Sequence, residues 1–464
     1  MTTTVIGAGY AGVMAANRLA ASGEGVTVVT PAPWFVERIR LHAVAGGTRP
    51  TARVALSELL HPDVTLVTDT VARIGDVLEL ASGATLTYDT AIYAVGSGGR
   101  RGAATGGDDD RDAAGEHGVG PDAPDGTGGD EAGRDATGGP GAGTSGVAAD
   151  AGRPGTGTTV HSVSDEASVL ALRAALARRP EAPVTVVGAG LTGVELAGTL
   201  RASGRRVRLV TASEPVRRGP RAQLASLVRA GVDVEVRRWS AGGESASTDD
   251  AERSRGGARP GPVVDRVGAA TPPTDRGDAP ARTARTARSG EDRVEPADPD
   301  AIVVDATGFA YPTLAADSGL PTDALGRLLV DASLTVPGRP RILGAGDAVR
   351  IDAPGYGHLR PACATALPMG AHAADVILAR AQGRPVPVFG LGYVLQCVDL
   401  GDGRGHIQLV HSDDTERQLA VTGRAGGMVK EAVCRMTLRW LTQEGRRPGS
   451  YRWAAPPRSR SGAA

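Results

Sequence analysis

The chain has few aromatic residues and a single lysine. Aromatic residues make up 3% of its 464 residues, and the 51 lysine and arginine residues include one lysine, Lys430. We interpret this bias toward arginine as the coding bias of a GC-rich genome. The formal net charge is −1, so the composition gives no indication of a nucleic-acid partner.

Cysteines are equally scarce. Cys363, Cys397 and Cys434 lie far apart and form no C-x-x-C pair, so neither a disulfide framework nor a metal site is predicted, and a reduced compartment is favoured. The first apolar segment starts close behind Met1, which leaves no room for a signal peptide. No apolar run approaches the roughly 18 residues of a membrane-spanning helix. We therefore expect a cytoplasmic protein.

Glycine, in contrast, is abundant and is placed at informative positions. An apolar strand, Thr4–Ile6, leads into Gly7, Gly9 and Gly12 with the spacing G-x-G-x-x-G, and a helical run follows. In such a motif the first glycine permits a tight turn, the second lets the backbone approach a pyrophosphate, and the third lets the helix pack on the strand. The helix N-terminus offers free N–H groups to the phosphates.

The same pattern recurs in the middle of the chain. The strand Val184–Val187 precedes Gly188, Gly190 and Gly193, and a helix is predicted from Val194 to Ala202. A lone fingerprint is a weak signal, but two copies, each between a strand and a helix, predict two dinucleotide sites.

In each half the strand after the fingerprint ends where a residue should meet the adenosine ribose. This residue is usually an acid, but here it is Thr30 in the first half and Thr211 in the second. Beyond Thr30, residues 34–42 hold two aromatic residues and several cations. One interpretation is a segment beneath a flavin ring, with Arg40 or His42 facing its polar edge, and the alternative is a loop with a partly buried face.

The pattern also predicts the remaining elements. We expect a helix at residues 54–60 and a long helix at 360–382 with Pro361 in its first turn. Short antiparallel strands are expected at 64–67, 71–74, 77–80 and 85–87. The C-terminal part is predicted to form strands at 394–400, 406–410 and 417–421, followed by a helix at 426–441.

Two segments change composition sharply. Residues 98–157 and 240–299 are rich in Gly, Ala, Asp, Thr and Pro and contain no aromatic residue. Such segments cannot bury enough apolar surface to offset chain entropy. We predict two disordered insertions, and linkers are favoured over acidic loops that bind a basic partner.

The motifs resemble the flavoproteins with two dinucleotide-binding domains and a glutathione-reductase-like fold. Within that group the chain is most similar to the branch of type II NADH dehydrogenases and apoptosis-inducing factor. The stretch Thr192–Ala197 matches its T-G-V-E-L-A motif, and residues 306–308 and 344–347 match its late motifs. The resemblance implies FAD and NAD(P)H as cofactors. It implies the following site residues: Gly7, Gly9, Gly12, Thr30, Arg40, Gly96, Gly346 and Asp347 for FAD; Gly188, Gly190, Gly193, Thr211 and Gly308 for NAD(P)H; and Glu195 where nicotinamide meets flavin.

The expected fold is α/β, with two Rossmann-like domains and a small C-terminal α+β region. The FAD-binding domain should comprise residues 1–97 and 311–385, and the NAD(P)H-binding domain residues 158–239 and 300–310. The insertions separate these parts, and residues 386–464 form the C-terminal region.

The chain departs from its relatives at two places. Thiol reductases of the group carry a redox cysteine pair soon after the first strands, which is missing here. Quinone reductases carry an A-Q-x-A-x-Q run, where this chain has Cys363 and Leu367 in place of both glutamines. A small packing residue is the favoured role of Cys363 over a redox role.

We therefore expect an FAD-dependent oxidoreductase that passes a hydride from NAD(P)H to the flavin and electrons to an acceptor, with quinone as one candidate. NADH is slightly favoured over NADPH, although Arg217 and Arg218 could attract a 2′-phosphate. One alternative is a flavin-binding redox sensor or interaction protein with low turnover, and another is a reductase that feeds ferredoxin or an oxygenase.

The C-terminal helix adds a hypothesis about the membrane. An apolar stripe next to basic residues suits peripheral contact with an anionic bilayer, whereas packing of the stripe on the protein body is the alternative. The stripe comprises Met428, Val429, Val433, Met436, Trp440 and Leu441. The sequence does not determine the oligomeric state.

Overall fold

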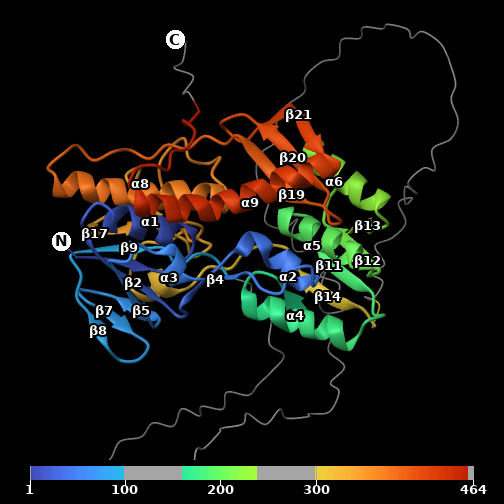
Figure 1. The fold of residues 1–464 in the computed structure, drawn as a ribbon, viewed down its shortest axis with the longest axis horizontal. Coiled ribbons are helices and arrows are strands. Elements are labelled where there is room, and N and C mark those ends of the chain that lie inside the picture. The colour runs from blue at the N-terminus through green and yellow to red at the C-terminus, as the bar shows by residue number, and fades with distance from the viewer. Residues whose placement is uncertain (1, 99–158, 238–297, 299, 458–464) are drawn as a thin grey trace, which may run out of the picture. The chain divides into compact units, whose positions relative to one another are not determined.

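The computed structural model describes residues 2–98, 159–237, 298 and 300–457. The two segments that we predict to be disordered therefore lie almost entirely outside the described residues. The described part contains two large sheets, one entirely and one predominantly parallel, which confirms the predicted α/β fold class (Figure 1).

The first sheet has six strands in the order β16-β17-β9-β1-β2-β5. All neighbouring strands are parallel except β16 and β17. Figure 1 shows helices α8 and α9 next to α1, and both contact α1. The bounds are β1 Thr2–Ile6, α1 Tyr10–Ala20, β2 Gly25–Thr30, β5 Val64–Thr68, β9 Thr90–Tyr93, β16 Thr335–Val336, β17 Arg339–Gly344, α8 Cys363–Ala381 and α9 Gly423–Arg446.

The second sheet has five parallel strands in the order β10-β14-β11-β12-β13. Helix α4 begins after Asp165, whose carboxylate accepts a hydrogen bond from the Ser168 backbone N–H at 2.8 Å and thereby caps the helix. The bounds are β10 Val160–Ser162, α4 Glu166–Arg178, β11 Val184–Val187, α5 Leu191–Ala202, β12 Val207–Thr211, α6 Arg218–Arg229, β13 Asp233–Val236 and β14 Ile302–Asp305.

Four smaller sheets complete the described part: two antiparallel sheets of three strands, and the two-stranded pairs β15-β18, which is parallel, and β3-β4, which is antiparallel. One three-stranded sheet contains β6, β7 and β8, and the other contains β19, β20 and β21 and packs against α9. Their bounds are β6 Val71–Ile74, β7 Leu78–Leu80, β8 Thr85–Leu86, β19 Leu395–Asp399, β20 Gly405–Val410 and β21 Glu416–Thr422. The shorter elements are β3 Trp34–Val36, η1 Arg38–Arg40, α2 Leu41–Ala45, β4 Arg53–Ala55, α3 Leu56–Leu59, α7 Leu314–Asp317, β15 Leu328–Val330 and β18 Val349–Ile351.

Three of the predicted elements are wrong in detail. Residues 64–68 form β5, a parallel strand beside β2, rather than part of an antiparallel group, because alternation over four residues does not distinguish the two arrangements. The predicted helix at 54–60 is the end of strand β4 followed by the single turn α3. Helix α8 begins at Cys363, so Pro361 precedes it instead of lying in its first turn.

Buried apolar side chains form two clusters, one around each parallel sheet. Leu41 and Val44 of α2 belong to the second cluster, although α2 follows the first βαβ unit in sequence. This packing places α2 against α5, so the side chains of residues 40–42 come close to residues from the second half of the chain.

The buried histidine of α8 gives a prediction about acid stability. The His372 side chain packs against Phe389, with ring centroids 5.3 Å apart. Burial lowers the pKa of His372 from 6.5 to about 4. Between these values the unfolded chain binds a proton that the folded chain excludes. We therefore expect the free energy of unfolding to fall by about 3 kcal/mol as the pH drops from 6.5 to 4 because of this residue.

Urea unfolding at a series of pH values checks this expectation. A His372→Gln variant should lose nearly one proton of the pH dependence near pH 5. An unchanged pH dependence in the variant would contradict the assignment.

Candidate cofactor cleft

The first glycine fingerprint has the local geometry of a pyrophosphate-binding turn. Gly7 has a φ of 102°, and a Cβ added to it would lie 2.5 Å from the Ala94 carbonyl oxygen. A Cβ on Gly12 would lie 1.9 Å from the Gly7 carbonyl oxygen, whereas one on Gly9 would meet nothing within 4 Å. The protein itself therefore fills the space at the first and third glycines and leaves open the second, where α1 begins.

The second fingerprint repeats this geometry with nearly the same values. A Cβ added to Gly188 would lie 2.6 Å from the Ala306 carbonyl oxygen, and one added to Gly193 would lie 1.8 Å from the Gly188 carbonyl oxygen. A Cβ on Gly190 would meet nothing within 4 Å. Gly190 is the N-cap of α5. Both turns thus offer an uncovered helix N-terminus to a phosphate group.

A cleft of about 1110 Å³ joins the second fingerprint to residues of the first half and of the C-terminal region. Of the predicted site residues, six line it: Gly188, Gly190, Glu195, Thr211, Gly308 and Asp347. A neighbouring cavity of about 600 Å³ is lined by Gly346 and also by Asp347, Arg360 and Pro361. Asp347 therefore lies at the wall of both cavities.

Asp347 has the environment expected of a residue that holds a hydroxyl-rich ligand. Its Oδ2 accepts a hydrogen bond from the Ser97 hydroxyl at 3.4 Å, and within the described residues its buried Oδ1 has no hydrogen-bond partner. Burial raises the pKa of Asp347, although the charge of Arg38 opposes the shift. A buried acceptor without a partner is costly, and a ribityl hydroxyl of FAD would satisfy it.

Within residues 34–42, Arg38 and His42 line the cleft, whereas Arg40 does not. The guanidinium of Arg38 donates hydrogen bonds to the carbonyl oxygens of Ser97 and Ser164, the latter at 2.6 Å, and Arg38 lines the cleft. Arg40 is absent from the residues that line it and instead binds Glu37 and Glu431, each at 3.0 Å. The sequence offered no signal that separates the two arginines, because both lie in the same short segment.

The two threonines that end the second strands differ in environment. Thr30 is buried at the end of β2. Thr211 lines the cleft at the end of β12, and its hydroxyl donates to the Ser213 carbonyl oxygen at 3.0 Å. Gly96 lies next to Arg38 and has a φ of 72°, a left-handed conformation that favours glycine.

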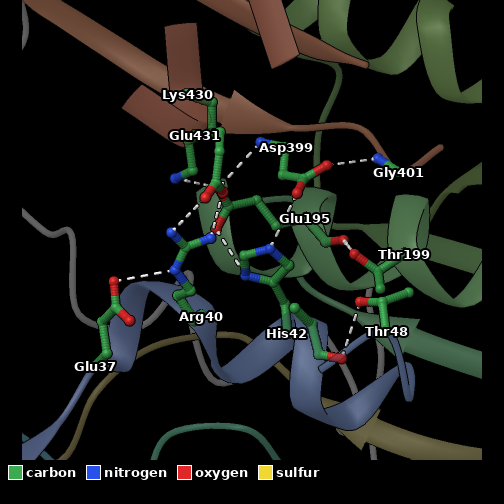
Figure 2. A network of polar contacts seen from close by, with 11 residues as sticks. Glu37, Arg40, His42, Thr48, Glu195, Thr199, Asp399, Gly401, Lys430 and Glu431 are labelled. Atoms are coloured by element: carbon green, nitrogen blue, oxygen red, sulfur yellow. Dashed lines mark hydrogen bonds and ion pairs between the residues drawn. The ribbon is translucent and has the colours of Figure 1, made fainter. Parts of the chain in front are cut away.

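Glu195 lies at the centre of a network of polar contacts shown in Figure 2. Its Oε1 is 2.8 Å from the Lys430 Nζ and accepts a hydrogen bond from the Asp399 backbone N–H at 3.0 Å, while its Oε2 is 3.5 Å from His42 Nδ1. Burial alone would lower the pKa of Lys430, but the Glu195 carboxylate raises it well above its ordinary value. The single lysine of the chain is thus a charged partner of the predicted catalytic residue.

The three cysteines, which are far apart in sequence, gather around Lys430. Cys363 and Cys397 line the cleft, and Cys434 is buried on α9. Burial raises the pKa of all three thiols, that of Cys363 to about 12 and that of Cys434 to about 11. All three are free thiols, which stay protonated at neutral pH. Within the described ranges, no group of three His, Cys, Asp or Glu side chains is placed to hold a metal ion.

Comparisons with known proteins agree with this architecture. Residues 1–118 and 136–238 match the family model of the pyridine nucleotide-disulphide oxidoreductases, and no curated protein matches the chain in sequence. The chain is therefore pyridine nucleotide-disulphide oxidoreductase-like, as its motifs predicted.

Three solved structures illustrate the shared fold. NDH2 from Plasmodium falciparum in complex with NADH has a TM-score of 0.62 and 12% identity, over 97% of this chain and 98% of that chain. The sulfide:quinone oxidoreductase from Aquifex aeolicus has a TM-score of 0.60 and 14% identity, over 95% and 91%. The covalent putidaredoxin reductase–putidaredoxin complex has a TM-score of 0.53 and 18% identity, over 88% and 81%.

Proposed function

We propose that the protein is an FAD-dependent NAD(P)H oxidoreductase of the NADH dehydrogenase type. The observation that carries the proposal is the pair of glycine turns, each closed at its first and third glycine and open at its second. A purely structural role of these glycines would not require the second position of both turns to face open space. The cleft that runs from the second turn to Asp347 supports a site where two dinucleotides meet.

Different residues of the chain would hold the different parts of the two cofactors. The turn at Gly9 would hold the FAD pyrophosphate and Asp347 its ribityl chain, while Gly190 and Thr211 would hold the NAD(P)H pyrophosphate and ribose. Glu195 would lie near the nicotinamide. When bound, the flavin supplies the chemistry of hydride acceptance and onward electron transfer, and the protein supplies orientation and electrostatics.

Absorbance spectroscopy of the purified protein tests the proposal. We expect the visible bands of bound FAD and their bleaching on anaerobic titration with NADH. A colourless protein that also fails to bind added FAD would overturn it, and a yellow protein that NADH does not bleach would restrict it to flavin binding.

The preferred donor is a separate prediction. We propose a preference for NADH, which the resemblance to the NADH dehydrogenases favours. The preference should be at most a few-fold in kcat/KM, because Thr211 carries no charge that repels a 2′-phosphate, and Arg217 and Arg218 at the start of α6 could attract one. An acid at this position is the usual means of selecting NADH. Comparison of kcat/KM for both donors checks the prediction. A tenfold advantage for NADPH would reverse it, and loss of that advantage in Arg217→Ala would locate the cause.

We also propose peripheral contact with a membrane that carries an apolar acceptor. No helix of the described chain is long and apolar enough to cross a bilayer. The predicted stripe on α9 is divided: Leu441 packs inward, whereas the Met428 and Met436 side chains are exposed. The exposed side of α9 and the nearby β21 therefore combine apolar side chains, among them Leu419, with arginines such as Arg435.

Co-sedimentation with anionic liposomes tests this contact. We expect binding at low salt that weakens at high salt. It should fall in a Met428→Gln/Met436→Gln variant and persist in the control Leu325→Gln, which changes an exposed leucine elsewhere. Wild-type protein that stays in the supernatant at low salt would favour a soluble acceptor.

A further inference from the structure

The imidazole of His42 lies between two carboxylates that come from different parts of the chain. Its Nδ1 is 3.5 Å from Glu195 Oε2 on α5, and its Nε2 is 3.4 Å from Asp399 Oδ2 at the end of β19 (Figure 2). A neutral imidazole carries a proton on one nitrogen and can accept another on the second. Because His42 lies between two carboxylates, it is placed to pass a proton from one carboxylate to the other.

The two ends of this chain of contacts have different surroundings. His42, Glu195 and Lys430 line the cleft, whereas Asp399 does not, and 32% of the Asp399 side chain is exposed. Lys430 and the Asp399 backbone N–H both bind Oε1 of Glu195, so Oε2 is left to face His42. The contacts therefore run from an exposed carboxylate through one buried ring to a carboxylate on the cleft wall.

The proposed reaction requires such a supply of protons. A hydride from NADH carries two electrons and one proton, so an acceptor that gains two electrons and two protons, such as a quinone, needs one further proton from solvent. Hydride transfer itself needs no general acid. The demand for a proton therefore arises only when the acceptor is reduced.

We propose that Asp399 and His42 form a proton relay that carries this proton from solvent to Glu195. The relay rests on the proposed function and adds the source of the proton to it. Asp399 takes up the proton, the His42 ring accepts it at Nε2 and releases the proton on Nδ1, and Glu195 receives that proton at Oε2. Glu195 then gives its proton to the acceptor as the acceptor is reduced, and becomes a carboxylate again. The transfer leaves the His42 ring with its proton on Nε2 instead of Nδ1, so reorientation of the ring restores the starting tautomer before the next turnover.

The charged groups around the relay keep Asp399 ionised. Glu195 faces Lys430 from α9 and, beyond it, the thiols of Cys397 and Cys434. Burial raises the pKa of Asp399, but the hydrogen bond and charge of His42, the Gly401 backbone N–H and the charge of Lys430 together outweigh burial and leave the pKa below its ordinary value. Asp399 is therefore ionised near neutral pH, and a proton that it takes up from solvent passes on rather than staying bound. Arg40 of the same segment as His42 is bound by Glu37 and Glu431 and faces neither end of the relay.

Two variants remove the relay while leaving in place the residues to which the two dinucleotides are assigned, namely the glycine turns, Asp347, Thr211 and Glu195. His42→Gln keeps a side chain that can hydrogen-bond but cannot carry a proton, and Asp399→Asn keeps the backbone N–H that binds Glu195. His61→Gln is the matched control, because His61 contacts Asp63 on the surface of the first half at 3.7 Å. FAD content and bleaching by NADH should stay within twofold of wild type in all three variants.

The variants are then compared with two acceptors and by direct measurement of proton uptake. Menadione needs the further proton, whereas ferricyanide takes up electrons only. We expect menadione reduction to fall at least about tenfold in both relay variants, as for loss of a general acid–base group, with ferricyanide reduction within twofold. In a single turnover of the NADH-reduced protein with menadione, followed with phenol red, the uptake of one proton should slow by the same factor. His61→Gln should behave as wild type.

Three results would overturn the relay. Equal losses with menadione and ferricyanide would assign His42 a purely structural role, and unchanged proton uptake in both variants would exclude it from proton transfer. If the wild-type protein oxidises NADH with neither acceptor, the proposed function fails and the relay fails with it.

Discussion

A Gly9→Val variant is expected to fold normally and to lose FAD. The Gly9 backbone has φ −82° and ψ −168°, which valine also adopts, and a Cβ at this position touches no protein atom within 4 Å. The added methyl groups would therefore occupy only the space in which a pyrophosphate must approach the backbone. We expect the affinity for FAD to fall about 100-fold, equivalent to about 2.7 kcal/mol.

Two matched variants make this result specific. Gly12→Val should not fold, because its Cβ would lie 1.9 Å from the Gly7 carbonyl oxygen. Gly190→Val, at the equivalent open position of the second fingerprint, should keep its FAD but resist bleaching by NADH. FAD content after gel filtration and the melting temperature provide the measurements. A soluble Gly9→Val protein with a full complement of FAD would show that the first fingerprint is not the FAD site.

The Glu444→Gln variant is expected to lose about 3 kcal/mol of unfolding free energy. Glu444 is fully buried near the end of α9, and its Oε1 accepts hydrogen bonds from Arg18 Nε and from the Gly449 backbone N–H, each at 2.6 Å. Its Oε2 accepts from the Tyr451 backbone N–H at 2.7 Å. An amide places an NH₂ group against these donors and leaves the buried Arg18 charge with Asp375 as its remaining ionised partner.

The control for this variant is an exposed ion pair. Asp233→Asn breaks the contact of Asp233 with Arg208 at 3.0 Å, and we expect a loss below about 1 kcal/mol because both side chains face water. Urea unfolding of both variants gives the comparison. Equal losses of unfolding free energy in the two variants would show that the contacts of Glu444 do not stabilise the packing of α9 and the C-terminal tail on α1.

The two dinucleotide turns could be predicted from sequence because they are local. An apolar strand, three glycines at fixed spacing and a helical run all lie within about twenty residues, and the turn and the close packing require glycine at Gly7 and Gly12 for reasons of backbone space alone. Local signals were weaker for residues 64–68, because a short alternating segment is compatible with either kind of sheet.

The network around Glu195 could not be predicted in this way. The sequence resemblance indicated Glu195, but the partners of this residue come from α2, β19 and α9, with His42 and Asp399 separated by 357 positions. No periodicity connects such residues. The C-terminal helix shows the same limit, because the side that α9 buries includes Lys430, Thr437 and Glu444, whereas its apolar residues predicted a different face.

The sequence by itself thus determined the class of the protein, the two nucleotide turns and the residues at their open positions, because short-range sterics and hydrophobic alternation decide these features. Only the tertiary structure decided that Arg38 and not Arg40 faces the cleft, that three distant cysteines gather near the single lysine, and that His42 lies between two carboxylates. These features depend on how α2 packs against α4 and α5 and how α9 packs against α1 and the β19–β21 sheet. That packing buries apolar surface and pairs buried charges over the whole described chain rather than within any one segment.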